Sequence, residues 1–218
     1  MSNVDAFVAE LENEIAALRV RFIEKWLPAD PLHSPADFQH DVKAFCILAH
    51  AAFEEYAEEL SLLVVTHVDE QWGKGLHSRS TIALLAAYGF AMEIVDDEAK
   101  TQDRIYDQVR AGVKECVSQH SITLSKNHGF SLKYLRSIFT PVGVDVPDSV
   151  VLLGSLGELA AARGSFAHSQ AKNAQYGQWK RAKRPMEPEK ASVAVGDCLD
   201  LCRSLAGKVK TLVGEGGE

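Results

Sequence analysis

The chain has 218 residues, of which 46% are hydrophobic and 24% charged, and its formal net charge is −7. This balance is typical of a globular protein and excludes an intrinsically disordered chain. The negative charge argues against a surface coated uniformly in positive charge for binding nucleic acid, but it leaves room for a local basic site.

The N-terminal third of the chain has the pattern of two long helices. Hydrophobic residues recur at spacings of three and four along residues 4–27, which predicts an amphipathic helix. Pro28, Pro31 and Pro35 then interrupt the pattern, since a proline inside a helix loses a backbone hydrogen bond. Pro35 suits the first turn of a helix, and a second long helix is predicted over about 36–65.

The rest of the chain continues as helices separated by glycine, proline and polar stretches. Residues 79–95 are so apolar that they predict a buried central helix. Further helices are predicted over 101–120, 131–139, 149–166 and 189–212. There is no internal repeat and no alternating strand pattern. The sequence therefore predicts an all-α single domain over residues 1–212, followed by a disordered tail, 213–218.

Targeting signals and membrane spans are not evident. No apolar run approaches the roughly 20 residues that cross a bilayer. The N-terminal segment 1–18 is acidic and lacks both the basic region and the cleavage site of a signal peptide. The four cysteines show no framework spacing. We therefore expect a cytoplasmic protein without membrane association.

Residues 158–170, ELAAARGSFAHSQ, contain Arg163 and His168 with four residues between them. Chance alone supplies roughly one arginine and histidine at four to six intervening residues in a chain of this composition, so the weight must come from the surroundings. From Leu159 to Met186 there is no acidic residue. The same window holds basic side chains that suit phosphates and aromatic ones that suit unpaired bases. These candidate RNA-binding residues are Lys172, Tyr176, Trp179, Lys180, Arg181, Lys183 and Arg184.

Single-stranded or loop regions of RNA are the partner that this window suggests, and a solvated loop whose lysines and arginines face water is the alternative. The helix geometry adds a constraint, because positions five apart differ by about 140° around an ideal helix. Arg163 and His168 converge only if Gly164 and Ser165 form an irregularity, or if two chains pack so that each contributes its pair to one cleft. Otherwise His168 satisfies terminal carbonyls and Arg163 lies on the surface.

Three stretches, taken in order, resemble the HEPN superfamily, nearest its RiboL-PSP-like branch. They are FCILAHAAFEEYAEEL (45–60), NHGFSLKYLRSIFTPVGVDV (127–146) and ELAAARGSFAH (158–168), of which the last resembles the family's helix with arginine and histidine separated by four to six residues. The resemblance implies an antiparallel helical bundle, a single HEPN-type domain. It also implies a homodimer with a composite active site that cuts RNA without metal or cofactor.

The chemistry that the resemblance implies is attack of a ribose 2′-OH on the adjacent phosphorus, leaving a 2′,3′-cyclic phosphate. His168 would act as acid and base, since an imidazole titrates near neutral pH. Arg163 would neutralise the nonbridging oxygens with its bidentate fork. Glu54, in the first stretch, would lie near the motif and orient Arg163.

One position departs from the family pattern, in which a polar residue often follows the arginine and Gly164 stands here. Ser165 is a candidate substitute. The alternative function is therefore a catalytically inert module that binds RNA or a protein partner. The resemblance further implies the toxin or effector of a toxin–antitoxin or antiphage defence system, with an antitoxin or defence partner.

Several pairs of residues four apart have the ligand types of a metal site. Nothing in the sequence brings the pairs together, so buried cysteines and satisfied core histidines are the expected explanation, without a bound metal. A helical scaffold stabilised by metal is a third hypothesis. The pairs are Cys46 with His50, Cys116 with His120, Cys198 with Cys202, and His50 with Glu54.

Overall fold

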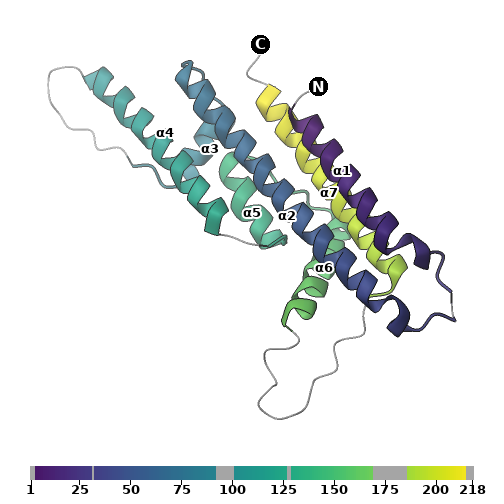
Figure 1. Cartoon of the computed structure of the whole chain (residues 1–218). Coiled ribbons are helices and arrows are strands. Elements are labelled where there is room, and N and C mark those ends of the chain that lie inside the picture. The colour runs from purple at the N-terminus through teal and green to yellow at the C-terminus, as the bar shows by residue number, and fades with distance from the viewer. Residues whose placement is uncertain (1–2, 31, 92–100, 127–128, 169–185, 215–218) are drawn as a thin grey trace, which may run out of the picture. The chain divides into compact units, whose positions relative to one another are not determined.

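A computed structural model describes residues 3–30, 32–91, 101–126, 129–168 and 186–214. Over these residues the chain forms seven α-helices and two short 3₁₀ turns, with no strand (Figure 1). The prediction of an all-α fold is confirmed. The elements are α1 (Asn3–Phe22), η1 (Glu24–Trp26), α2 (Pro35–Gly73), α3 (Arg79–Ala87), α4 (Thr101–Lys126), α5 (Leu132–Phe139), η2 (Thr140–Val142), α6 (Val150–His168) and α7 (Pro188–Gly214).

The first two helices end at different residues from those predicted. The helix expected over 4–27 ends at Phe22, and Leu27 is extended with φ −116° and ψ 139°. A residue before proline is driven out of the helical region by the proline ring, which explains the extended Leu27. In contrast, α2 continues eight residues beyond 65 to Gly73. No glycine or proline interrupts it before that point, and its further turns bury apolar residues such as Val68.

The prediction of a buried central helix over 79–95 was correct for a helix beginning at Arg79 but wrong in its length and its burial. Helix α3 ends at Ala87, and Gly89 follows with φ +69°, a left-handed conformation that an α-helix does not contain. Ile82 on α3 is 67% exposed, so the helix is not buried all round. High apolar content was mistaken for burial here. Residues 92–95 lie outside the described part of the chain.

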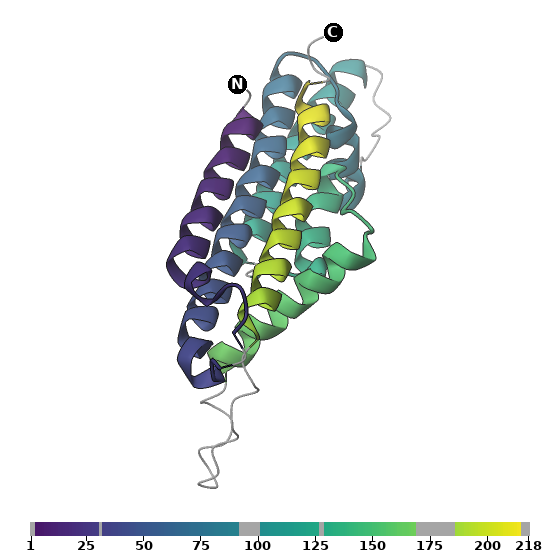
Figure 2. The same ribbon diagram turned by 90° about the vertical axis from the view of Figure 1, so that its right-hand side faces the viewer.

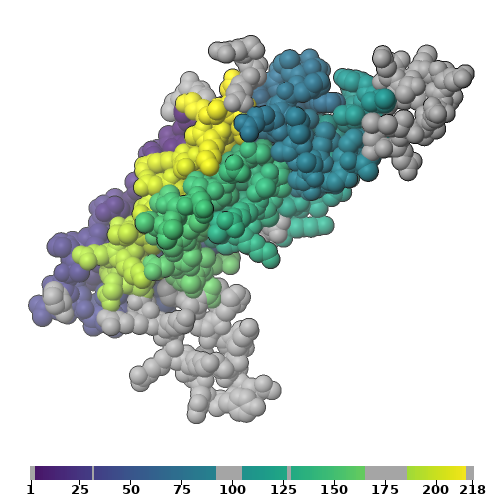
Figure 3. Space-filling view, turned by 180° about the vertical axis from the view of Figure 1, so that it is seen from behind, coloured from purple at the N-terminus to yellow at the C-terminus, as the bar shows by residue number. Residues whose placement is uncertain are grey.

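Contacts group the chain into two compact units. Unit 1 comprises residues 1–57, 129–132 and 147–204. Within it α1 lies beside the first part of α7 (Figures 1 and 2). The surface of α6 borders that of α7 (Figure 3), where Ser155 Oγ donates a 2.5 Å hydrogen bond to Asp197. The core of unit 1 contains the fully buried side chains of Phe45, Phe53, Phe130, Leu156, Leu159 and Leu201.

Unit 2, residues 58–128, 133–146 and 205–218, contains a buried chain of hydrogen bonds. Ser61 Oγ donates to the carbonyl of Ile138 at 2.9 Å and lies 2.9 Å from Nε2 of His120. The hydroxyl of Ser61 has one proton, which it donates to the Ile138 carbonyl. Nε2 of His120 must therefore carry a proton and donate it to Ser61 Oγ. Nδ1 of His120 then accepts from the Tyr88 hydroxyl, which lies at 2.9 Å and is farther, 3.3 Å, from Thr123. This chain joins α2, α4 and α5 to the end of α3.

Two further predictions concern the ends and the surroundings of the chain. Helix α7 continues to Gly214, and the rest of the predicted tail, residues 215–218, lies outside the described residues. The single domain over residues 1–212 stays a prediction. No helix in the part of the chain that the structure describes is long and apolar enough to cross a membrane.

Candidate functional site

Arg163 is half-buried on α6, in unit 1. The helix is unbroken from Val150 to His168, so the irregularity considered at Gly164 and Ser165 is absent from its backbone. Positions 163 and 168 therefore differ by about 140° around one helix axis. A cleft shared by two chains stays a prediction. The side chains of Ser165 and His168 lie outside the described part of the structure.

Two side chains of α2, one turn apart, bind the backbone just after α4. His50 is 3% exposed, and its Nε2 accepts the N–H of Phe130 at 3.2 Å. Glu54 Oε1 accepts the N–H of the preceding residue, Gly129. The second carboxylate oxygen, Oε2, lies 3.8 Å from Nδ1 of His50. Both amides of the Gly129–Phe130 turn are thus bound by the same face of α2.

The aromatic ring of Phe130 completes this attachment. It is fully buried, stacked on Phe53 with 5.2 Å between ring centroids and edge-on to His50 at 6.2 Å. Gly129 has φ +122°, a backbone conformation that L side chains rarely adopt, although nothing lies within 4 Å of the place of a Cβ. Glycine is therefore required here by the backbone and not by crowding.

The electrostatics connect α2 with Arg163. Burial in the first place, and the positive charge of Arg163 in the second, lower the pKa of His50 to about 4. The imidazole is therefore neutral at pH 7, and Arg163 lies near enough for its charge to act on it. A half-buried guanidinium interacts more strongly with an arriving anion than a fully solvated one does, because water screens it less. The arrangement suits the binding of a phosphate.

Of the predicted catalytic and supporting residues, the structure describes the side chains of Arg163 and Glu54. Glu54, expected to orient Arg163, lies one helical turn from His50, on which the charge of Arg163 acts. Direct orientation of Arg163 by Glu54 stays a prediction. The candidate RNA-binding residues all lie outside the described residues: Lys172, Tyr176, Trp179, Lys180, Arg181, Lys183 and Arg184.

Sequence reasoning placed His50 among metal-ligand pairs and satisfied core histidines, and it missed the connection with Arg163. The spacing of His50 and Glu54, which puts both on one face of α2, was the available signal. Their backbone partners lie 80 and 75 residues away along the chain, respectively. No local pattern predicts such a pairing.

The metal hypothesis gains no support from the described residues, among which no three histidine, cysteine or acidic side chains gather so as to hold a metal ion. Both ring nitrogens of His120 are already hydrogen-bonded. All four cysteines are buried and free. Burial raises the pKa of Cys46 and of Cys198 to about 12, so these thiols are protonated and not thiolate ligands.

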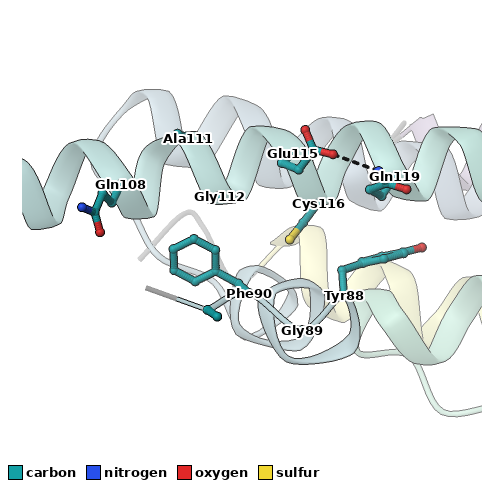
Figure 4. A pocket seen from close by; sticks show the side chains of 10 residues that line it. Tyr88, Gly89, Phe90, Gln108, Ala111, Gly112, Glu115, Cys116 and Gln119 are labelled. Atoms are coloured by element: carbon teal, nitrogen blue, oxygen red, sulfur yellow. Dashed lines mark hydrogen bonds between the residues drawn. The ribbon is translucent and has the colours of Figure 1, made fainter. Parts of the chain in front are cut away.

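Unit 2 holds a cavity of about 750 Å³ between residues 88–91 and one face of α4 (Figure 4). The rings of Tyr88 and Phe90 lie on one side of α4, with the sulfur of Cys116 between them. Gly112 makes room for Phe90, because a Cβ there would come within 2.1 Å of its ring. No lysine, arginine or histidine is among the residues that line this cavity. Its chemistry therefore does not suit a phosphate, and the surroundings of Arg163 remain the candidate site.

Comparison with known proteins gives one match. A family model described as RiboL-PSP-HEPN matches residues 12–210. No curated protein and no solved structure matches significantly.

Proposed function

Because the chain belongs to the RiboL-PSP-HEPN family, we propose that it is a metal-independent endoribonuclease. Membership suggests a module that cleaves or binds RNA, and cleavage is the finer step that we propose. The observation that carries it is the half-buried Arg163, whose positive charge acts on a buried neutral histidine of α2. A half-buried guanidinium, which water screens less than an exposed one, supplies the charge that a phosphate in the transition state requires.

The proposed reaction begins when the His168 imidazole of one copy of the chain removes the proton of a ribose 2′-OH. The 2′-oxygen attacks the adjacent phosphorus, and the bond from phosphorus to the 5′-oxygen breaks. A second imidazole gives its proton to that 5′-oxygen, leaving a 2′,3′-cyclic phosphate and a 5′-hydroxyl. Arg163 binds the nonbridging oxygens, on which negative charge grows during the attack.

The two imidazoles come from two copies of the chain, each of which contributes Arg163 and His168 to one cleft. The unbroken α6 supports this arrangement, because positions 163 and 168 differ by about 140° around its axis within one copy. Mixing wild type with an excess of His168→Ala tests it. If a cleft needs both imidazoles, the activity per wild-type subunit falls in proportion to the wild-type fraction, to about one tenth in a 1:9 mixture of freely exchanging dimers. Unchanged activity per wild-type subunit would show that each chain acts alone.

We further propose that the stretch from Leu159 to Met186, which contains no acidic residue, binds single-stranded or loop regions of RNA. Its lysines and arginines would neutralise phosphates, and Tyr176 and Trp179 would stack on unpaired bases. Phosphate binding of this kind predicts affinity that weakens steeply with salt. Changing Lys180 and Arg181 to alanine together should reduce that salt dependence, which fluorescence anisotropy of a labelled RNA measures.

The inert RNA-binding or protein-binding module is favoured by one observation, Gly164 at the position after Arg163. Nothing lies within 4 Å of the place where a Cβ of Gly164 would stand, so a polar side chain would fit there. The chain lacks a side chain at a place that has room for one. Binding of RNA without cleavage would support this second function.

Cleavage is tested by incubating the purified protein with total RNA in the presence of EDTA. We expect fragments with 2′,3′-cyclic phosphate ends from wild type and none from His168→Ala. His40→Ala is the matched control, because His40 is an exposed histidine of α2 outside the Arg163–His168 motif. Intact RNA with wild type, or equal cleavage by His168→Ala, would contradict the proposal.

A role as toxin or effector, held in check by an antitoxin or another defence partner, rests on the resemblance alone. Expression of wild type in a bacterial host should arrest growth, and expression of His168→Ala should not. Arrest by both proteins would separate toxicity from RNA cleavage.

A further inference from the structure

The cavity of unit 2 has the size of a small-molecule site. It measures about 750 Å³ and lies between residues 88–91 and one face of α4 (Figure 4). Pockets that bind small molecules range over roughly 300–1,000 Å³. Every residue that lines the cavity belongs to unit 2, and none takes part in the proposed cleavage of RNA. The cavity is therefore a candidate for a second, separate binding site.

Tyr88 and Phe90 form an aromatic wall of the cavity, and each ring is held in place by its own contact. The Tyr88 hydroxyl donates to Nδ1 of His120 at 2.9 Å, at the end of the buried chain of hydrogen bonds. The Phe90 ring packs against the α4 backbone at Gly112, where a Cβ would come within 2.1 Å of it. The Phe90 N–H also donates to the carbonyl of Leu85 at 3.0 Å. Both rings are thus in position before a ligand arrives.

The polar groups that α4 contributes give the cavity a negative charge. Gln119 Nε2 donates to Oε1 of Glu115 at 2.9 Å, so the amide oxygen of Gln119 and the second carboxylate oxygen can accept from a ligand (Figure 4). Burial raises the pKa of the Cys116 thiol, which therefore stays uncharged. Glu115 is the one ionised side chain among the described residues that line the cavity. This lining favours a ligand that has a positive charge and hydrogen-bond donors.

We propose that the cavity binds an amphipathic organic amine, whose ammonium group pairs with the Glu115 carboxylate and lies against the rings of Tyr88 and Phe90. The face of an aromatic ring attracts a cation through the ring's quadrupole. The hydrocarbon part of the amine would contact Ala91 and Ala111, which also line the cavity. An anionic ligand would meet the Glu115 carboxylate without a counter-charge. Binding of the amine does not depend on whether the chain cleaves RNA.

Three probes that share a phenylethyl group isolate the effect of charge. They are 2-phenylethylamine, 2-phenylethanol and 3-phenylpropionate, which end in an ammonium, a hydroxyl and a carboxylate, respectively. In calorimetric titrations of the full chain at pH 7, the amine should bind with a Kd of about 1 mM or lower. The alcohol should bind about fivefold more weakly, and the carboxylate more weakly still. No binding of the amine, or equal binding of the amine and the alcohol, would overturn the proposal.

Substitutions then locate the site. Glu115→Gln should weaken binding of the amine about three- to fivefold and leave that of the alcohol unchanged. Glu70→Gln is the matched control, because it removes the same charge from an exposed residue of unit 2 that does not line the cavity. Phe90→Leu keeps an apolar side chain but removes the ring, and it should weaken the amine more than the alcohol. In nuclear magnetic resonance spectra, the amine should shift the backbone N–H signal of Gly112. Equal effects of the two glutamate variants, or an unshifted Gly112 signal, would overturn the proposal.

Discussion

Low pH should destabilise the fold because the buried His120 resists protonation, and His120→Gln should remove this contribution. His120 is fully buried, and burial lowers its pKa to about 4. A histidine of the unfolded chain titrates near pH 6.5. Because the unfolded state then binds the proton first, the stabilising contribution is fully present above about pH 6.5 and is lost progressively as the pH falls from 6.5 to about 4.

The magnitude follows from the difference between these two pKa values. It corresponds to about 3 kcal/mol of unfolding free energy when the pH has fallen below both. Of this, about 2 kcal/mol is lost between pH 7 and pH 5. His50 has a similarly lowered pKa, about 4, so a comparison in which only His120 changes is needed to isolate one contribution.

The assay is urea unfolding of wild type and His120→Gln at pH 7 and at pH 5. The variant should be less stable at pH 7, because its hydrogen bonds to Ser61 and Tyr88 are disturbed. On acidification it should lose about 2 kcal/mol less than wild type. Equal losses in the two proteins, or a His120 ring that titrates near pH 6.5 in the folded wild type, would show that His120 does not cause the acid destabilisation.

Three further outcomes are expected. Gly129→Ala should lower the free energy of unfolding by about 2 kcal/mol in urea titrations, because alanine is strained at φ +122°; an unchanged midpoint would contradict that backbone conformation. Ser61→Ala should lower the free energy of unfolding by about 2 kcal/mol in thermal or urea titrations, since it leaves the Ile138 carbonyl and His120 Nε2 without their partner. An unchanged free energy of unfolding would contradict the buried hydrogen bonds of Ser61. Gly164→Asn should raise the cleavage rate about tenfold if one added hydrogen bond serves the transition state, and a rate at or below that of wild type would show that the polar residue is dispensable.

The helices could be predicted from the sequence because each buries a face at regular spacing. Their ends were predicted well where proline or glycine fixes the backbone, as at Pro35. Prediction failed where burial was inferred from composition alone. Residues 79–95 are apolar, yet Ile82 on α3 is 67% exposed. Which apolar residues are covered depends on elements far away in the chain. Periodicity within one helix does not contain that information.

The candidate site residues stay predictions. Arg163 and Glu54 were selected by resemblance, and the charge of Arg163 acts on His50, one helical turn before Glu54. The role of His50 was missed because its partner is a backbone N–H 80 residues away, and any residue except proline supplies one. The cytoplasmic location, the homodimer and the defence role stay predictions.

The most direct test of the central claim compares two RNA oligonucleotides that differ in one oxygen. One carries ribose at a mapped cleavage site, and the other carries 2′-deoxyribose at that nucleotide alone. In EDTA, the ribose substrate should be cleaved to products with a 2′,3′-cyclic phosphate and a 5′-hydroxyl, and the deoxy substrate should stay intact. Cleavage of the deoxy substrate, or products with a 3′-hydroxyl and a 5′-phosphate, would contradict it.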